Sequence, residues 1–214
     1  MRLPCLSWLG LSPVPRAGLA PSSVTQAGAE LADEIGFSRL SMGLLAERLG
    51  VKPPSLYKHV DGMADLVHRI GVLAITELAD AIRDAIGGRA GRDALDSGAR
   101  AMRAWAREHP GRYAAGNAAE ITGPDDPLIA AANRVMDSWS AMLHGYRIEP
   151  SQQIHALRML RSQLHGFVTL ETAGGFQIST DIDDSFDWII DFIDRGLQAP
   201  SPSKVNTMRA VFTP

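Results

Sequence analysis

The chain has 214 residues, of which 45% are hydrophobic and 21% are charged, and its formal net charge is −3. This length suits one or two domains with a sizeable core, and the composition is that of an ordinary globular protein. Cys5 is the single cysteine and no apolar run approaches the ~20 residues of a membrane-spanning helix, so we expect a cytoplasmic protein without disulfides or membrane spans.

Ala, Leu, Arg, Asp and Ile dominate long stretches, and the Val/Thr/Tyr-rich alternation of β-sheets is missing. We therefore predict an all-α protein of about nine helices, three of them short and crowded near the N-terminus. Residues 1–20 hold three prolines and are expected to form a disordered arm. The first helix is predicted from a cap at Ser22 or Ser23 to Ile35, with Gly36 ending it.

Two short helices joined by a tight turn are predicted between Ser41 and His59. Ser41 is a candidate N-cap for the first of them, Met42–Leu49. Gly50 permits a positive φ at the turn, and Pro53 suits the first turn of the second helix. The apolar residues expected to hold the two helices together are Leu45, Leu49, Val51 and Leu56. This pattern is typical of a helix-turn-helix.

A long helix from about Met63 to Ile86 is predicted next, followed by a glycine-rich loop at 87–92. Further helices are predicted at 93–108, 113–120, 128–143, 150–170 and 181–197. We divide the chain into a disordered arm (1–20), a helix-turn-helix domain (21–67), a second helical domain (68–200) and a C-terminal tail (201–214).

The second helix of the motif carries side chains that can contact DNA. Its free faces hold Lys52, Ser55, Tyr57, Lys58 and His59. Such groups hydrogen-bond to phosphates and base edges in a major groove. A pI near 6.1 does not by itself indicate a nucleic-acid binder. The stretch from Arg48 to Val60, however, has two or three fixed positive charges and no acid, which suits a protein that touches DNA with one end only.

Four segments between residues 22 and 67 stand in a distinctive order: Glu30-Leu31-Ala32, Gly36-Phe37, Leu45-Ala46-Glu47-Arg48-Leu49-Gly50-Val51 and Leu56-Tyr57-Lys58-His59-Val60. With them, this part of the chain resembles the DNA-binding domain of TetR-family transcriptional regulators. It implies an all-α homodimer, usually a repressor, that binds a palindromic operator in double-stranded DNA. It also implies that residues 68–200 bind a small-molecule effector, which releases the operator, and form the dimer.

The resemblance further implies DNA-contact roles for eight residues. Ser41 looks like a phosphate contact at a helix N-terminus, and Tyr57 and His59 match the family's phosphate-contacting aromatic and imidazole. The positions that contact base edges or the adjacent backbone correspond to Lys52, Pro53, Pro54, Ser55 and Lys58. Met63 stands where the family commonly has a phosphate-binding lysine. This departure predicts a shallower salt dependence, or compensation by Arg39 or the arm.

The second domain resembles the TetR subgroup named for a Trp-His-Gly motif, with Leu164 in the Trp position before His165 and Gly166. Its aromatic and methionine side chains could line an apolar effector cavity. The candidates are Met102, Trp105, Trp139 and His165. The alternative is structural, with Trp105, Trp139 and Trp188 in the core and His165 hydrogen-bonded to a neighbouring helix.

Two apolar stripes could form a four-helix dimer interface or be buried within the monomer, and periodicity leaves both possibilities open. One stripe is Leu157, Leu160, Leu164 and Val168, and the other is Ile189, Ile190, Phe192 and Ile193.

The sequence does not support an enzyme or a metal centre. Its histidines are scattered without metal spacing to an acid or cysteine, and it has no catalytic triad order or phosphate-cradling loop. We expect no cofactor. An activator or a ligand-independent regulator would share the DNA chemistry and stays an alternative, while a helical carrier or enzyme is disfavoured.

Overall fold

The computed structural model describes residues 19–199, and all regular elements in that range are helices. They are α1 (Pro21–Ile35), η1 (Phe37–Arg39), α2 (Met42–Arg48), α3 (Pro53–Leu56), α4 (Met63–Ile86), α5 (Gly91–Glu108), α6 (Pro110–Ala118), α7 (Pro127–Met142), η2 (Pro150–Gln152), α8 (Gln153–Thr172) and α9 (Ile182–Gln198). The prediction of an all-α fold with about nine helices is confirmed for this range. The predicted tail and residues 1–18 of the predicted arm lie outside the described residues.

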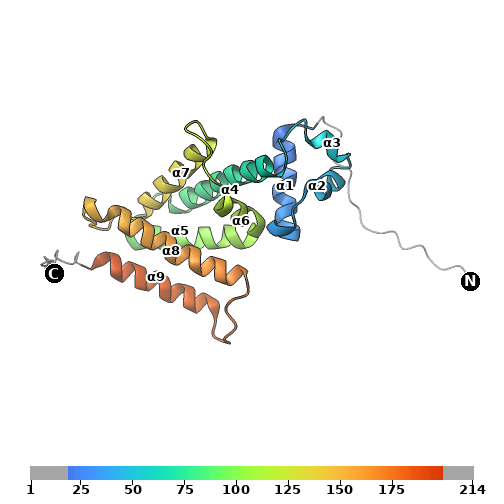
Figure 1. Ribbon diagram of the computed structural model, residues 1–214. Helices are drawn as coiled ribbons and strands as arrows, with labels where there is room; N and C mark the ends of the chain where they lie inside the picture. Colours follow the sequence, from blue (N-terminus) through green and yellow to red (C-terminus); the bar gives the residue numbers. More distant parts are fainter. Residues whose placement is uncertain (1–18, 200–214) are drawn as a thin grey trace, which may run out of the picture.

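A head, consisting of α1 to α3 and the first half of α4, lies at one end of the molecule (Figure 1). It has its own hydrophobic core, whose fully buried members include Val24, Ala29, Leu45, Leu56, Leu66 and Ile70. Burying a Val, Leu or Ile side chain of this core contributes roughly 1.5–3 kcal/mol. Because Leu45 comes from α2 and Leu56 from α3, this core fixes the angle between the two short helices.

The turn after α2 has the hydrogen bonds of a Schellman motif. Val51 N donates to Ala46 O at 3.0 Å and Gly50 N donates to Glu47 O at 3.0 Å, with Gly50 at φ +65°. These bonds satisfy carbonyls that the helix end would otherwise leave unpaired. The predicted turn at Gly50 therefore has the backbone conformation that favours glycine.

Two predicted helix boundaries in the head were wrong. The first helix begins at Pro21, and Ser23 lies inside it, where its hydroxyl donates to Ala20 O at 2.9 Å. The α-helical part of α3 ends at Leu56, so Tyr57, Lys58 and His59 lie in the following turn. That turn is fixed because His59 N donates to Leu56 O at 2.8 Å.

The rest of the molecule forms a body around the second half of α4, which packs against α5, α6 and α7 (Figure 1). The body core includes the buried side chains of Ile82, Leu95, Met142, Leu160, Leu164, Phe186, Ile190 and Ile193. The proposed boundary at residue 67 falls inside α4, a continuous helix that shares one end with each core. None of the helices in residues 19–199 could span a lipid bilayer.

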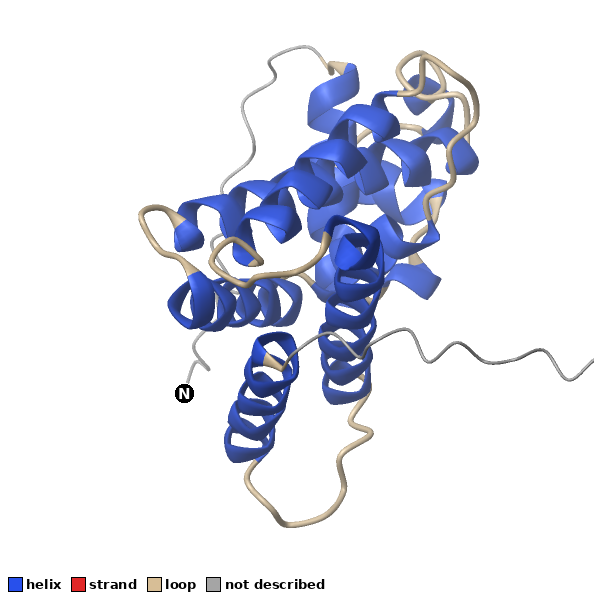
Figure 2. Ribbon diagram, turned by 90° about the vertical axis from the view of Figure 1, so that its left-hand side faces the viewer, coloured by secondary structure: helices blue, strands red, loops and turns tan. Residues whose placement is uncertain are grey.

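Helices α8 and α9 lie side by side, and the ends joined by their loop project beyond the rest of the body (Figure 2). Most of the two predicted stripes are buried within the protomer, since Leu160, Leu164 and Val168 of α8 and Ile190 and Ile193 of α9 belong to the body core. The prediction of Trp188 as a core residue was wrong, because its side chain is 61% exposed. It stacks on the exposed Phe192 with ring centroids 5.5 Å apart.

Candidate functional site

Seven of the eight predicted DNA-contact residues lie in one largely exposed segment of the head, residues 52–59. Lys52, Pro53, Pro54, Tyr57 and Lys58 are exposed, and Ser55 and His59 are partly buried. Leu56 is fully buried between them and anchors the segment to the head core. The polar side chains therefore project from a fixed backbone, as a surface that docks in a groove requires.

Ser41 is the N-cap of α2, as predicted. Its Oγ accepts a hydrogen bond from Leu44 N at 3.3 Å, and the residue is exposed. The hydroxyl proton is not used in this cap. It can therefore donate to a phosphate oxygen while the cap is retained.

The positive charge of this surface comes from lysines. Of the three lysines in the chain, Lys52 and Lys58 lie here, and neither makes an ion pair within residues 19–199. Arg48 instead donates to Glu34 at 2.6 Å, a contact that raises the pKa of Arg48. The charge of Arg48 is thus compensated inside the head. Between Arg48 and Val60, the two cations without an ion pair are therefore Lys52 and Lys58.

Met63 takes an apolar role at the start of α4. It is partly buried and packs against the head core. Arg39 is exposed and makes no ion pair in the described part of the chain. Its charge is therefore available two positions before Ser41 in the sequence. The arm that could also compensate for Met63 lies outside the described residues.

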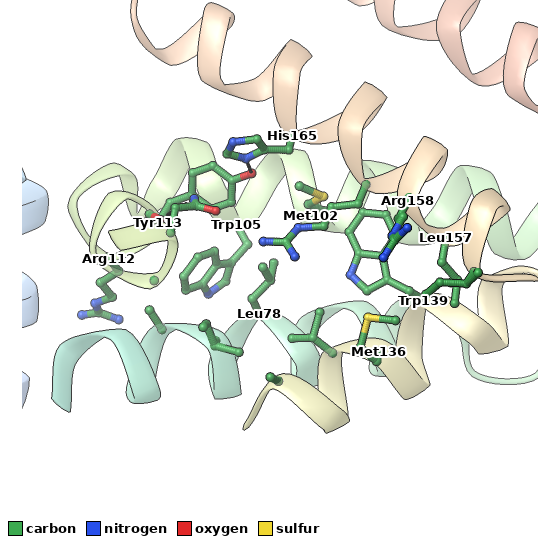
Figure 3. A pocket seen from close by; sticks show the side chains of 18 residues that line it. Leu78, Met102, Trp105, Arg112, Tyr113, Met136, Trp139, Leu157, Arg158 and His165 are labelled. Atoms are coloured by element: carbon green, nitrogen blue, oxygen red, sulfur yellow. Dashed lines mark hydrogen bonds between the residues drawn. The ribbon is translucent and has the colours of Figure 1, made fainter. Parts of the chain in front are cut away.

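A cavity of about 280 Å³ lies inside the body (Figure 3). All four predicted effector residues line it: Met102, Trp105, Trp139 and His165. Helices α4 to α8 all contribute to its wall, with Ile75, Leu78, Val135, Met136 and Leu157 adding apolar surface. Met102 and Trp139 are also buried members of the body core, so the cavity and core interpretations of these residues hold together.

Tyr113 and His165 form a polar pair at one end of the cavity (Figure 3). The Tyr113 hydroxyl lies 2.7 Å from His165 Nδ1. Burial raises the pKa of Tyr113 to about 12. Burial and the charge of Arg161 lower the pKa of His165. Both side chains are therefore uncharged near pH 7, and His165 has the predicted hydrogen bond to a neighbouring helix as well as a place in the cavity wall.

The cavity wall is connected to the head through Arg112 on α6. Its backbone N donates to Asp33 Oδ1 of α1 at 2.8 Å, and its Nη1 donates to Glu77 Oε2 of α4 at 3.0 Å. Arg112 Nε lies 3.0 Å from Asp33 Oδ2 without hydrogen-bond alignment, so that contact is electrostatic. Arg112 also lines the cavity, which places one side chain at both the cavity and the head.

Close backbone packing reinforces this contact between head and body. A Cβ atom added at Gly111 would lie 2.1 Å from the carbonyl carbon of Ala32, so α6 approaches α1 more closely than any larger residue allows. His109, at the start of α6, places its Nδ1 3.4 Å from Asp33 Oδ2 and its ring 5.2 Å from that of Trp105. A displacement of α6 at the cavity would therefore be felt at α1.

The sequence did not predict this junction or the arginines of the cavity wall, Arg112, Arg158 and Arg161. Asp33 and Glu77 are 79 and 35 positions from Arg112 in the chain. Spacing rules work within one helix, and these contacts join three.

Comparisons with known proteins agree with this arrangement. The sequence model for "Bacterial regulatory proteins, tetR family" matches residues 24–70, and that for "Tetracyclin repressor-like, C-terminal domain" matches residues 95–193. The chain is 34% identical over 178 residues to the HTH-type transcriptional regulator YobS of Bacillus subtilis, covering 82% of this chain and 91% of YobS.

Two solved structures have the same fold. BioQ, solved with its double-stranded DNA operator, is 20% identical, with 86% of this chain and 100% of that chain covered and a TM-score of 0.61. A single-residue variant of TetR from Acinetobacter baumannii AYE, solved with minocycline, is 24% identical, with the same coverage and a TM-score of 0.62. Together with the two matched sequence models and the YobS relative, they lead to one conclusion: the chain belongs to the TetR family of DNA-binding transcriptional regulators.

Proposed function

We propose that this regulator is a repressor that binds a palindromic operator as a homodimer and leaves it when a small molecule fills the body cavity. The observation that carries the proposal is the continuous contact from the cavity wall through Arg112 to Asp33 on the head. The operator bound to BioQ and the minocycline bound to the TetR variant support the two partners by analogy. An activator would use the same two sites.

The proposed DNA surface consists of Ser41, Lys52, Pro53, Pro54, Ser55, Tyr57, Lys58 and His59. Lysine and hydroxyl groups at exposed positions contact phosphates, which supplies affinity, and side chains at the start of α3 contact base edges, which supplies sequence preference. The exposed Pro53 and Pro54 rings can pack against a thymine methyl group.

The proposed dimer interface lies on the outer face of α8 and α9. Large apolar side chains are exposed there, namely Trp188, Phe192 and Leu170. A hollow between the two helices, bordered by Phe167, Leu170 and Trp188, adds surface that a second copy can fill. Exposed apolar patches of this kind mark interaction sites, since water contact with them is unfavourable.

Release of the operator follows from geometry. A symmetric dimer binds two half-sites about 34 Å apart, so both heads must keep that separation. A ligand that favours another position of α6 would move α1 through Arg112 and Gly111, and the head with it. The ligand shifts this equilibrium only by the difference between its affinities for the two states.

The test is binding to the DNA that flanks the protein's own coding region, measured at moderate salt. We expect Tyr57→Ala combined with Lys58→Ala to weaken binding to a palindrome in that DNA. Arg147→Ala, at an exposed position outside the head, is the control and should bind like the wild type. Unchanged binding by the double variant would show that the contact surface is wrong.

A further inference from the structure

We propose that the effector is an organic acid: a molecule with one carboxylate group attached to an apolar aromatic or alkyl skeleton. This inference rests on the proposed function, because it names the chemical class of ligand for the cavity of that proposal. It is carried by two guanidinium groups in a mainly apolar wall, Arg158 and Arg161 on α8.

The charge of the cavity wall is unbalanced. Its eighteen lining residues, drawn in Figure 3, include three arginines and no aspartate or glutamate. The chain as a whole has 24 acidic residues against 21 basic ones, so a wall without carboxylates departs from the composition around it. The wall therefore presents positive charge to whatever enters.

The three arginines differ in their partners. Arg112 is compensated by Asp33 and Glu77, both within 3.0 Å. Arg158 and Arg161 make no ion pair with any carboxylate of residues 19–199, whereas Arg103, in the same body, is paired with Glu171 at 2.6 Å. Two guanidinium groups, three residues apart on one helix, are thus free to bind the same anion.

The position of the two guanidinium groups suits a carboxylate at the solvent-facing end of the ligand rather than one buried deep in the cavity. Arg158 and Arg161 are exposed side chains that also line the cavity, so they stand where it meets solvent. In the view of Figure 3, Arg158 is drawn next to the Trp139 indole, with Leu157 to the right and Met136 below. An acid can place its carboxylate at the guanidinium groups while its apolar part lies deeper, against the indole and methionine side chains.

The rest of the wall determines how polar and how large the remainder of the ligand can be. Apart from the arginines, the polar side-chain groups of the wall are those of Tyr113, Asn117 and His165 and the indole N–H groups of Trp105 and Trp139. Tyr113 and His165 already bond to each other, and the Asn117 amide nitrogen donates to Tyr113 O at 2.8 Å. About 280 Å³ of space lies near the lower end of the range of ligand pockets. This favours a ligand with a compact apolar skeleton and few hydrogen-bonding groups besides its carboxylate.

Arginine and carboxylate suit each other because both are planar and can pair through two parallel hydrogen bonds. A neutral amide of the same shape could still accept a hydrogen bond from a guanidinium group, but it would lack the charge attraction and the paired hydrogen bonds of a carboxylate. A cationic ligand would be repelled by both guanidinium groups, with no acid in the wall to offset them. The wall therefore discriminates between ligands by the charge of the head group.

The experiment compares acids with amides of the same skeleton by titration calorimetry on the full chain. The probes are octanoate, decanoate and 1-naphthoate, each matched with octanamide, decanamide and 1-naphthamide. We expect the acids to bind the wild type at least about ten-fold more tightly than their amides, the scale of a charge-assisted hydrogen bond. In the Arg158→Gln/Arg161→Gln variant the preference should fall to within about two-fold.

Arg147→Gln is the matched control, because it removes one exposed charge outside the cavity and should keep the full preference. Since Arg158 and Arg161 have no carboxylate partner within residues 19–199, their replacement should leave the melting temperature unchanged, which shows that the variant folds. Equal binding of acids and amides, binding of amides alone, failure of every acid to bind, or a preference that survives in the double variant would each overturn the inference.

Operator binding separates this inference from the proposed function. If the acids bind through the two arginines but leave operator binding unchanged, the ligand class stands and the proposed release mechanism fails. If the protein leaves its operator only for the neutral probes, the release mechanism stands and the acid inference fails.

Discussion

The exposed segment from Lys52 to His59 concentrates much of the chemistry of the head in a few residues. Lys52, before α3, and Lys58, after it, supply the positive charge of this segment, because Arg48 is paired with Glu34 and Met63 is packed against the core. Each lysine in contact with a phosphate releases a counterion when DNA binds, which makes affinity depend on salt.

Replacing Lys52 or Lys58 by glutamine should therefore weaken operator binding about equally for matched and mismatched sequences. Each change should also reduce the slope of log K against log salt by about 1. The measurement is a series of binding isotherms at several salt concentrations. A slope that both variants share with the wild type would contradict phosphate contact by these lysines.

His165, in the cavity wall, makes the stability of the protein depend on pH. Its pKa is lowered by burial and by Arg161, so the folded protein takes up a proton at lower pH than the unfolded chain does. Above about pH 6.5 the imidazole is neutral in both states and contributes no pH dependence. Below that value the unfolded chain binds the proton first, and the free energy of unfolding falls.

The variant His165→Gln lacks this loss and retains a polar group opposite Tyr113. We expect the melting temperature of the wild type, relative to that of the variant, to be higher at pH 8 than at pH 5. Thermal unfolding followed by circular dichroism at both values would measure it. A difference that is the same at the two pH values would contradict a neutral His165.

At the scale of helices, two buried ion pairs hold elements together that are distant in the chain. Arg103 on α5 binds Glu171 on α8 at 2.6 and 2.8 Å, with its guanidinium 4.7 Å from the centre of the Phe186 ring of α9. Arg112 joins α6 to α1 and α4. The first pair fixes the body, and the second connects it to the head.

Arg103→Met should destabilise the protein by up to about 3–5 kcal/mol, because it removes both hydrogen bonds to the largely buried Glu171 and leaves only Arg107, whose Nη1 lies 3.7 Å from Glu171 Oε1. The double variant Arg103→Met/Glu171→Met should recover much of that loss, since apolar residues can replace both charges. Urea unfolding curves of the three proteins provide the measurement. A single variant as stable as the wild type would show that the pair is not needed.

The junction at Asp33 should control communication rather than binding. Asp33 does not line the cavity, so in the absence of DNA the Asp33→Asn variant should bind the effector with nearly the affinity of the wild type. The weakening of operator binding by effector should shrink several-fold, within the usual range of about 1–3 kcal/mol of coupling between sites. Asp125→Asn, an exposed position in the loop before α7, is the control. Full coupling in Asp33→Asn would exclude this path.

For the whole molecule, the arrangement of two cores along α4 joins a small rigid head to a body with an internal cavity. The exposed pair Trp188 and Phe192 is left on the outer face of the body. A second copy covering this face would bring two heads together at a fixed distance, which a palindrome with two half-sites requires.

Trp188→Glu should therefore convert a dimer of roughly twice 23.0 kDa into a monomer and weaken binding to the palindrome strongly. Burying an unpaired carboxylate in an apolar interface is unfavourable, which drives the dissociation. Ile121→Glu, an exposed apolar position in the loop between α6 and α7, should stay dimeric. Sedimentation velocity measures both, and a wild-type monomer would contradict the two-half-site mechanism.

The sequence by itself determined what depends on neighbours along the chain. The periodicity of apolar residues predicted the helices, Gly50 and Ser41 predicted the turn and the cap, and Lys52 to His59 predicted a polar surface on the head. These features follow from bonds within a few residues. The same local rules placed the end of α3 too late, because the buried Leu56 and the turn after it decide that boundary.

Only the tertiary structure decided how distant segments meet. It brought Met102, Trp105, Trp139 and His165 to one cavity, placed Arg158 and Arg161 at its wall, and joined Arg112 to Asp33. It also buried Ile190 and Ile193 in the body while leaving Trp188 and Phe192 exposed. An apolar stripe states that a helix is buried on one side, and the packing of the other helices decides which partner covers it.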